Sequence, residues 1–234
     1  MRRGAKLGRV TPSMPTGWSC AAAALAVAAI VGALQAHGTT TGSVPLLHLG
    51  QARGFNRASI PDLTGRTALV TGATSGLGLG VARLLAGANA TLIVTGRSVA
   101  KCAAALADVR RHAPDGALIS CVELELLSLN ATARAAAAVA SAVKARSSRG
   151  LELLIANAGI MMPPSLLRSA DGIEAQFATN HLGHFHLANL LLPQLRKAGR
   201  PGGARVVAVS SLAHNFAPSQ PPFNLAELND ESAY

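Results

Sequence analysis

The chain has 234 residues, of which 50% are hydrophobic and 3% aromatic, enough for one sizeable α/β domain with an aliphatic core plus an appendage. Its net charge of +10 raises the question of a nucleic-acid partner. Fifteen of the 21 Lys and Arg residues follow residue 61, together with all eleven acids. These basic residues are scattered among few aromatic ones, so we exclude nucleic acid as a partner.

The first 61 residues differ in composition from the rest. They hold six basic residues and no acid, and the first carboxylate is Asp62. The uncharged run 18–36 is rich in alanine and therefore marginal as a membrane span, which needs about 20 predominantly apolar residues. We predict a targeting or membrane-anchor segment plus linker over 1–61 and a second domain over 62–234. The segment is a membrane anchor, a transit peptide for a plastid or mitochondrion, or a cleavable signal peptide.

The second domain begins with a strand, a glycine-rich turn and a helix. The strand is expected at 68–71 and the helix at 79–87, and Gly72, Gly76 and Gly78 lie between or at the edge of the two. A pyrophosphate must approach backbone N–H groups at a helix N-terminus, where side chains would obstruct it. A second strand follows the helix. This order of elements predicts one half of a dinucleotide-binding unit.

The end of the second strand, 91–95, decides which nicotinamide cofactor is expected. A dinucleotide-binding unit for NAD places an acid near this point, where it binds the adenosine ribose. The sequence has no carboxylate there, and Arg97 takes that place. A guanidinium pairs with a 2′-phosphate, which an acid would repel. We therefore predict NADP rather than NAD.

The stretch TGATSGLG, 71–78, resembles the cofactor signature of the short-chain dehydrogenase/reductase family. The resemblance runs from Ile60 to Tyr234 and is closest to the retinol-dehydrogenase-like branch, with its related plant reductases of plastid envelopes. It implies an α/β fold of the Rossmann type, a doubly wound parallel sheet of strand order 3-2-1-4-5 that lacks the family's last strands. Together with Arg97, it implies these cofactor-binding residues: Gly72, Thr74, Ser75, Gly76, Leu77, Gly78, Arg97, Glu125, Leu126, Asn157, Ala158 and Gly159.

The last five of these residues belong to the third and fourth strands. The stretch 121–129 resembles the family's third strand and places Glu125, where the family usually has Asp, and Leu126 beside the adenine. A buried strand at 153–155 then leads into the family's Asn-Asn-Ala-Gly turn, in which Ala156 replaces the first Asn. The resemblance implies that the small residues of this turn let the backbone approach the ribose and nicotinamide.

A helix expected at 172–199 carries the first catalytic candidate. Its stretch FATNHLGHF resembles the family helix whose asparagine holds a proton-relaying water, and the matching residue is Asn180. A polar Asn on an otherwise apolar helix face needs hydrogen-bond partners. The neighbouring His181, His184 and His186 do not share one face, and no nearby cysteine or acid completes a site. We assign these histidines to packing and local hydrogen bonds rather than to a metal.

A fifth apolar strand, within 203–214, ends in two serines. It resembles the strand that delivers the family's catalytic serine, and the match is Ser211, whose hydroxyl would hydrogen-bond the substrate carbonyl. Without later strands, this strand would be an exposed apolar edge. The family's acid-base tyrosine lies four residues before a lysine, and the sequence ends at Tyr234. We interpret Tyr234 as a bystander before a missing Tyr-x-x-x-Lys, with a catalytic Tyr234 as the alternative.

The three cysteines, Cys20, Cys102 and Cys121, have no short paired spacing. We therefore expect neither a disulfide framework nor a zinc site, and we expect Cys121 to be a small buried residue.

The resemblance implies an NADP-dependent oxidoreductase that passes a hydride between nicotinamide and a lipophilic carbonyl or alcohol, retinal-like or similar. Because the Tyr-Lys pair is missing, we expect a C-terminally truncated chain without turnover. The alternative function is a non-catalytic NADP-binding module or partner subunit. Membrane association is expected through residues 18–36.

Overall fold

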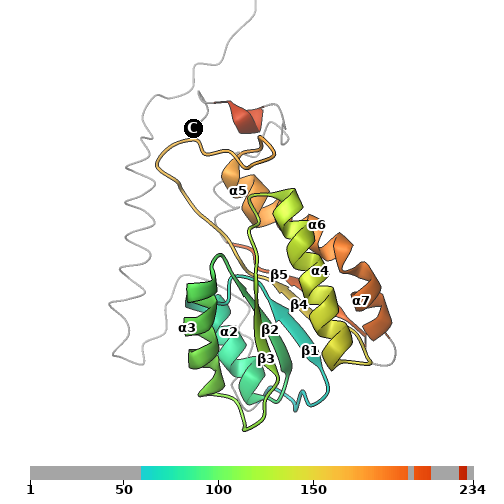
Figure 1. Cartoon of the computed structure of the whole chain (residues 1–234). Coiled ribbons are helices and arrows are strands. Elements are labelled where there is room, and N and C mark those ends of the chain that lie inside the picture. The colour runs from blue at the N-terminus through green and yellow to red at the C-terminus, as the bar shows by residue number, and fades with distance from the viewer. Residues whose placement is uncertain (1–58, 200–202, 212–226, 231–234) are drawn as a thin grey trace, which may run out of the picture. The chain divides into compact units, whose positions relative to one another are not determined.

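A parallel sheet runs through the part of the chain that the computed structural model describes, residues 59–199, 203–211 and 227–230. The predictions for the run 18–36 and for Tyr234 lie outside these residues. The strands occur in the spatial order β3-β2-β1-β4-β5, as predicted from the sequence (Figure 1). Each neighbouring pair is parallel. Their bounds are β1 Thr67–Val70, β2 Thr91–Gly96, β3 Ile119–Glu123, β4 Leu153–Ala156 and β5 Arg205–Ala208.

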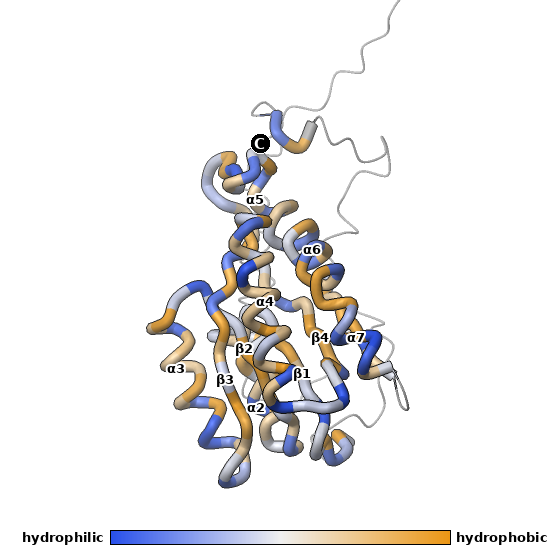
Figure 2. Tube along the Cα trace, turned by 45° about the vertical axis from the view of Figure 1, so that its right-hand side comes forward, coloured by the Kyte–Doolittle hydropathy of each residue, from blue (hydrophilic) through white to orange (hydrophobic). Residues whose placement is uncertain are grey.

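Helices cover both faces of this sheet. One face carries α2 (Gly76–Gly87) and α3 (Val99–Arg110), and the other carries α4 (Leu129–Arg146), α6 (Gly183–Leu190) and α7 (Leu192–Ala198) (Figure 1). Hydrophobic residues follow the strands between the two helical layers (Figure 2). The predicted α/β fold of the Rossmann type is therefore confirmed.

The central strands are apolar without alternation because both of their faces are covered. In β1, Leu69 packs into the core beneath α4, whereas its neighbours Ala68 and Val70 pack into the core beneath α2. All four residues of β5 are exposed instead, and Val206 keeps 54% of its surface accessible. Within the described residues, no strand pairs with the outer edge of β5.

The predicted helix at 172–199 is not continuous. It consists of α5 (Ala175–Phe177), a π-helical turn (Ala178–Leu182), α6 and α7. Pro193 lies in the first turn of α7. Proline lacks an N–H and clashes with the carbonyl four residues earlier, which explains the break between α6 and α7. The third strand begins two residues before the predicted stretch 121–129 and already ends at Glu123, after which the chain leaves the sheet toward α4.

Cys102 and Cys121 form a disulfide, so the expectation of unpaired cysteines was wrong. Their Cα atoms lie 5.6 Å apart, and the bond links α3 to β3 across 19 residues of sequence. Neither local spacing nor composition indicates this pair, since only the α3–β3 connection brings the two residues together.

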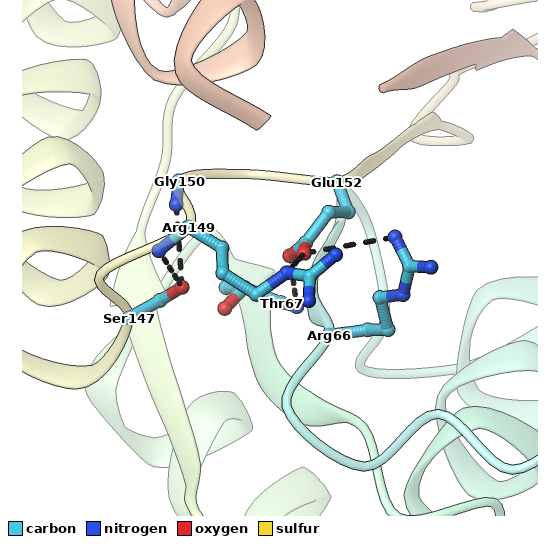
Figure 3. Close-up of polar contacts among 6 residues, drawn as sticks. All are labelled: Arg66, Thr67, Ser147, Arg149, Gly150 and Glu152. Carbon is cyan, nitrogen blue, oxygen red and sulfur yellow. Dashed lines mark hydrogen bonds and ion pairs between the residues drawn. The ribbon is translucent and has the colours of Figure 1, made fainter. Parts of the chain in front are cut away.

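The amino end of the sheet is closed by side chains (Figure 3). Glu152 is 6% exposed and accepts hydrogen bonds from the Thr67 backbone N–H, at 2.7 Å, and from Arg149 Nε, at 2.9 Å. Arg66 adds an ion pair at 3.8 Å. The Glu152 carboxylate is therefore paired within the chain, whereas the buried Thr67 Oγ1 has no hydrogen-bond partner among the described residues.

A 3₁₀ turn, Glu227–Asn229, lies beside the loop that precedes α5. Arg168 Nη2 donates to the Asn229 carbonyl at 2.7 Å, and Asn229 Nδ2 donates to the Gly172 carbonyl at 3.0 Å.

Over the described ranges, none of the helices has the length and apolar character needed to span a bilayer.

Candidate cofactor-binding and catalytic site

An open cleft of about 310 Å³ lies at the carboxyl edge of the sheet, where the strand order reverses between β1 and β4. A doubly wound sheet binds its ligand at this switch point. Eleven of the twelve predicted cofactor-binding residues line the cleft, and Gly76 is the exception. The eleven are Gly72, Thr74, Ser75, Leu77, Gly78, Arg97, Glu125, Leu126, Asn157, Ala158 and Gly159.

Two glycines of the first turn allow it to touch the turn after β4. Gly72 has φ +64°, and a Cβ there would lie 2.8 Å from Ala158 Cα. A Cβ at Gly78 would collide with Asn157 Nδ2 and with the Gly72 carbonyl oxygen. Glycine is required at both positions because a side chain would separate the two turns. Gly76 differs, since it has open space but a φ of +54°, which favours glycine for its backbone alone.

Thr71 joins the same two turns by hydrogen bonds. Its Oγ1 accepts from the backbone N–H groups of Asn157, at 2.9 Å, and Ala158, at 3.0 Å. Asn157 Nδ2 donates back to the Thr71 carbonyl at 2.9 Å. Thr71 was not among the predicted site residues, although its hydroxyl at the end of the first strand was an available signal.

Positive charge gathers where β2 leads into α3. Arg97 and Lys101 both line the cleft and are exposed. Ser98 caps α3, and its side chain accepts from the Lys101 backbone N–H. No acid lies in the first turn of α3. Two cations near a helix N-terminus favour a bound phosphate. Lys101 was missed from the sequence, although it lies one helical turn beyond Arg97.

Glu125 lies in the cleft and is half-buried. Its Oε1 accepts from the Leu127 backbone N–H at 2.9 Å, so the carboxylate is turned toward its own chain. Leu126 beside it is buried at 4% exposure. Glu125 and Leu126 both line the cleft, although they are distant in sequence from the glycine turn.

Asn180 lies in the π-helical turn and is bound to the chain beyond β4. Its Oδ1 accepts from the Ile160 backbone N–H at 2.9 Å, and its Nδ2 donates to the Ile160 carbonyl at 2.8 Å. The residue is exposed, so the expected partners are present although the expected burial is not. Ser211 is also exposed and follows the carboxyl end of β5. Thr179 lines the cleft, whereas Asn180 and Ser211 are not part of its lining.

His184 connects this turn to Thr71. It is 8% exposed, and its Nε2 lies 2.8 Å from Thr71 Oγ1. Its Nδ1 lies 3.2 Å from the Asn180 carbonyl oxygen. Burial lowers the pKa of His184 below its ordinary value. The assignment of this histidine to packing and hydrogen bonding is confirmed. Across the described residues, no group of His, Cys, Asp and Glu side chains could hold a metal ion.

A doubly wound sheet with a glycine-lined cleft at its switch point is the arrangement of the dinucleotide-binding class of folds. The sequence profile of the family described as short chain dehydrogenase matches residues 66–221, which is more than half of the chain. The chain therefore belongs to the short-chain dehydrogenase family, as the sequence motifs indicated. Members of this family are oxidoreductases that use nicotinamide cofactors.

Three curated relatives illustrate the range of similar proteins. Short-chain dehydrogenase TIC 32 A, chloroplastic, of Brassica napus is 40% identical over 64% of this chain and 45% of its own length. Polyprenol dehydrogenase of Danio rerio is 35% identical over 69% and 48%, respectively. Retinol dehydrogenase 13 of Homo sapiens is 38% identical over 77% and 51%. The chain thus spans about half the length of these relatives.

Solved structures have a similar fold. A crystal structure of a protein from Mycobacterium paratuberculosis has a TM-score of 0.56 and 41% identity, over 69% of this chain and 52% of that one. A complex of Pseudomonas aeruginosa RhlG with NADP has a TM-score of 0.54 and 25% identity, over 74% of this chain and 62% of that one.

Proposed function

We propose that the chain binds NADP and belongs to an oxidoreductase that transfers a hydride between nicotinamide and a lipophilic carbonyl or alcohol. The observation that carries the proposal is the cleft, in which Arg97 and Lys101 line the side next to the N-terminus of α3. The cofactor would supply or accept the hydride. Backbone N–H groups of the glycine turn would bind the pyrophosphate. Arg97 and Lys101 would bind the 2′-phosphate.

Charge supports NADP over NAD. The end of β2 carries Arg97 instead of an acid, and Lys101 adds a second cation. A 2′-phosphate is attracted to both side chains, whereas the 2′-hydroxyl of NAD gains little from them. The similar RhlG structure is a complex with NADP, which supports the same choice.

The substrate class rests on relatives and on the catalytic candidates. Two relatives of the chain are named for retinol and polyprenol, which are lipophilic alcohols. In the proposed reaction, the Ser211 hydroxyl hydrogen-bonds the substrate oxygen, and Asn180 holds a water that relays protons. Asn180 is hydrogen-bonded to Ile160, which comes shortly after the carboxyl end of β4, and Ser211 comes shortly after the carboxyl end of the adjacent strand β5.

Cofactor titration tests the proposal. We expect the full chain to bind NADPH more tightly than NADH, as measured by cofactor fluorescence. Arg97→Asp should weaken NADPH binding roughly ten- to hundredfold more than NADH binding, because a charge-assisted pair is replaced by repulsion. Arg110→Asp makes the same charge change at the other end of α3 and should leave the ratio unchanged. A ratio equal in wild type and Arg97→Asp would remove Arg97 from the phosphate site.

The 234 residues contain no Tyr-x-x-x-Lys pair, so NADPH binding without turnover fits both the oxidoreductase and a binding module. The two are separated by sequencing the transcript past the codon for Tyr234. An in-frame Tyr-x-x-x-Lys would favour hydride transfer, and a stop codon would favour the alternative, a non-catalytic NADP-binding module or partner subunit. NADPH oxidation with retinaldehyde by these residues alone would overturn the expectation of an inactive chain.

For the N-terminal segment, we propose membrane anchoring or import into a plastid. The basic, acid-free composition of 1–61 supports both, and the chloroplastic relative supports the second. Carbonate extraction and N-terminal sequencing of the expressed protein distinguish them. An intact chain retained in the membrane indicates an anchor, and a shortened soluble chain indicates a cleaved transit peptide.

A further inference from the structure

His184 is a buried titratable side chain for which the proposed reaction has no role. It lies in α6, contacts Thr71 across 113 residues of sequence, and so bridges two segments. One segment is the cofactor turn after β1, and the other is the π-helical turn that presents Asn180. A bridge between these segments bears on how the site is held together.

The hydrogen bonds of Thr71 determine which ring nitrogen of His184 carries the proton. A hydroxyl has one hydrogen and two lone pairs. The Asn157 and Ala158 backbone N–H groups occupy both lone pairs, at 2.9 and 3.0 Å. The hydroxyl hydrogen must therefore point to an acceptor. His184 Nε2, at 2.8 Å, is closer than the Ile155 carbonyl, at 3.3 Å.

His184 is consequently neutral, with Nε2 accepting from Thr71. The remaining ring hydrogen lies on Nδ1, which donates to the Asn180 carbonyl at 3.2 Å. A proton on Nε2 would point at the Thr71 hydroxyl, whose two lone pairs already accept from the Asn157 and Ala158 N–H groups. The burial of the ring agrees with this state, because burial disfavours the charged form.

These hydrogen bonds connect the two ends of the turn that follows β4. Thr71 holds the beginning of that turn, at Asn157 and Ala158, and Asn180 holds its end, at Ile160. His184 contacts both Thr71 and Asn180, and so links the two residues that hold this turn. The π-helical turn is part of the same arrangement, since the Gly183 N–H bonds to the Ala178 carbonyl and shifts the backbone ladder by one residue.

We infer that neutral His184 is a positioning residue, which sets the register of the Asn180 turn against the cofactor turn through Thr71. The inference rests on the proposed function for its consequence, namely that cofactor affinity depends on this bridge. The bridge itself is a property of the chain alone. It can therefore be tested without cofactor.

The first test measures the tautomer of His184 in the wild-type chain. Long-range ¹H–¹⁵N correlation spectra of the imidazole ring should show a protonated Nδ1 and an unprotonated Nε2 at neutral pH. A protonated Nε2 would overturn the inference. This measurement needs no variant and no ligand, so it tests the assigned tautomer of His184 even if the substituted proteins do not fold.

The second test compares His184→Phe with His186→Phe, a matched change two residues along α6. In His184→Phe, amide exchange at Ile160 should accelerate by about tenfold or more, because Asn180 loses its anchor. In His186→Phe it should stay within about twofold of wild type. Leu69 in β1 serves as an internal reference for global stability. Equal exchange at Ile160 in the two variants would overturn the inference.

The third measurement is NADPH affinity of the same proteins, expected to fall about tenfold in His184→Phe and to be unchanged in His186→Phe. If wild type binds no NADPH, the proposed function fails while the first two tests still decide the bridge. If wild type binds NADPH and both variants bind it equally, the positioning role is overturned.

Discussion

The amino and carboxyl ends of the sheet differ in their side chains, which make polar contacts with one another at the amino end and leave a cleft open at the carboxyl end. At the amino end, buried Glu152 accepts from Thr67 and Arg149, and Ser147 Oγ accepts from the backbone N–H groups of Arg149 and Gly150 (Figure 3). These carboxylate, hydroxyl and backbone groups are paired within the chain, although the buried Thr67 Oγ1 has no partner among the described residues. At the carboxyl end, glycines and small residues leave backbone open toward a cleft of about 310 Å³.

The difference lies in the side chains. A carboxylate and two guanidinium groups fill the amino end, whereas Gly72 and Gly78 keep side chains out of the carboxyl end because they would strike Ala158 and Asn157. One end therefore contributes stability, and the other is kept open for a ligand. Changes at the amino end should alter unfolding, and changes at the carboxyl end should alter cofactor binding.

The largest expected effect is at the carboxyl end. A methyl group in Gly78→Ala would collide with Asn157 Nδ2 and the Gly72 carbonyl, which separates the two turns. NADPH affinity should fall roughly a hundred- to a thousandfold, or about 3–4 kcal/mol. Gly80→Ala is the control, since a Cβ there meets nothing within 4 Å. Equal NADPH affinity in the two variants, by fluorescence titration, would contradict the close packing of the turns.

The next largest effect is expected from the Cys102–Cys121 disulfide and concerns the free energy of unfolding. The Cys102–Cys121 disulfide closes a loop of 19 residues' separation. Its loss in Cys102→Ala should lower the free energy of unfolding by about 3 kcal/mol, because the unfolded chain is less constrained. Urea denaturation of wild type with and without dithiothreitol checks this result. Wild-type unfolding that is insensitive to reductant, with two additional free thiols by mass spectrometry, would disprove the cross-link.

At the amino end, Glu152→Ala should lower the free energy of unfolding by about 2 kcal/mol. The Thr67 N–H, in a residue only 1% exposed, would lose its carboxylate partner at 2.7 Å. Glu123→Ala removes an exposed carboxylate at the end of β3 and should change the unfolding free energy little. NADPH affinity should be unchanged in both variants. A cofactor defect in Glu152→Ala would show that the two ends are not independent.

The smallest effect is the pH dependence contributed by His184. The unfolded chain takes up a proton on this residue near the ordinary pKa of 6.5, whereas burial lowers the pKa in the folded chain. The unfolded state then binds more protons, so stability is lost as the pH falls below the ordinary value. The loss levels off below the folded pKa. Its slope is at most about 1.4 kcal/mol per pH unit.

Urea denaturation of wild type and His184→Phe over about pH 5 to 7.5 isolates this contribution, because the other titrating groups are common to both proteins. We expect the stability of wild type to decline more steeply on acidification. Neighbouring His181 also lowers the pKa of His184 by its charge. Parallel curves for the two proteins would mean that His184 titrates alike in the folded and unfolded chains.

Local sequence was sufficient for the order of elements and for most of the cleft. The glycine turn, the apolar strands and the helix between them depend on backbone preferences and periodicity within a few residues. Parallel strands joined by helices restrict the sheet to few arrangements, and the family resemblance indicated which of them, the order 3-2-1-4-5. The place of Arg97 in the cleft was predictable in the same way, because it comes directly after the second strand.

Only the tertiary structure decided the remaining features. The Cys102–Cys121 disulfide, the Glu152 cluster and the Thr71–His184 bridge all join residues whose contact depends on how separate elements pack. The break of the predicted helix into a π-helical turn and α6 likewise accompanies the packing of Gly183 against the chain at Leu126. Sequence patterns report on neighbours within one element. Contacts between elements depend on the crossovers that bring distant segments together, and no local pattern records them.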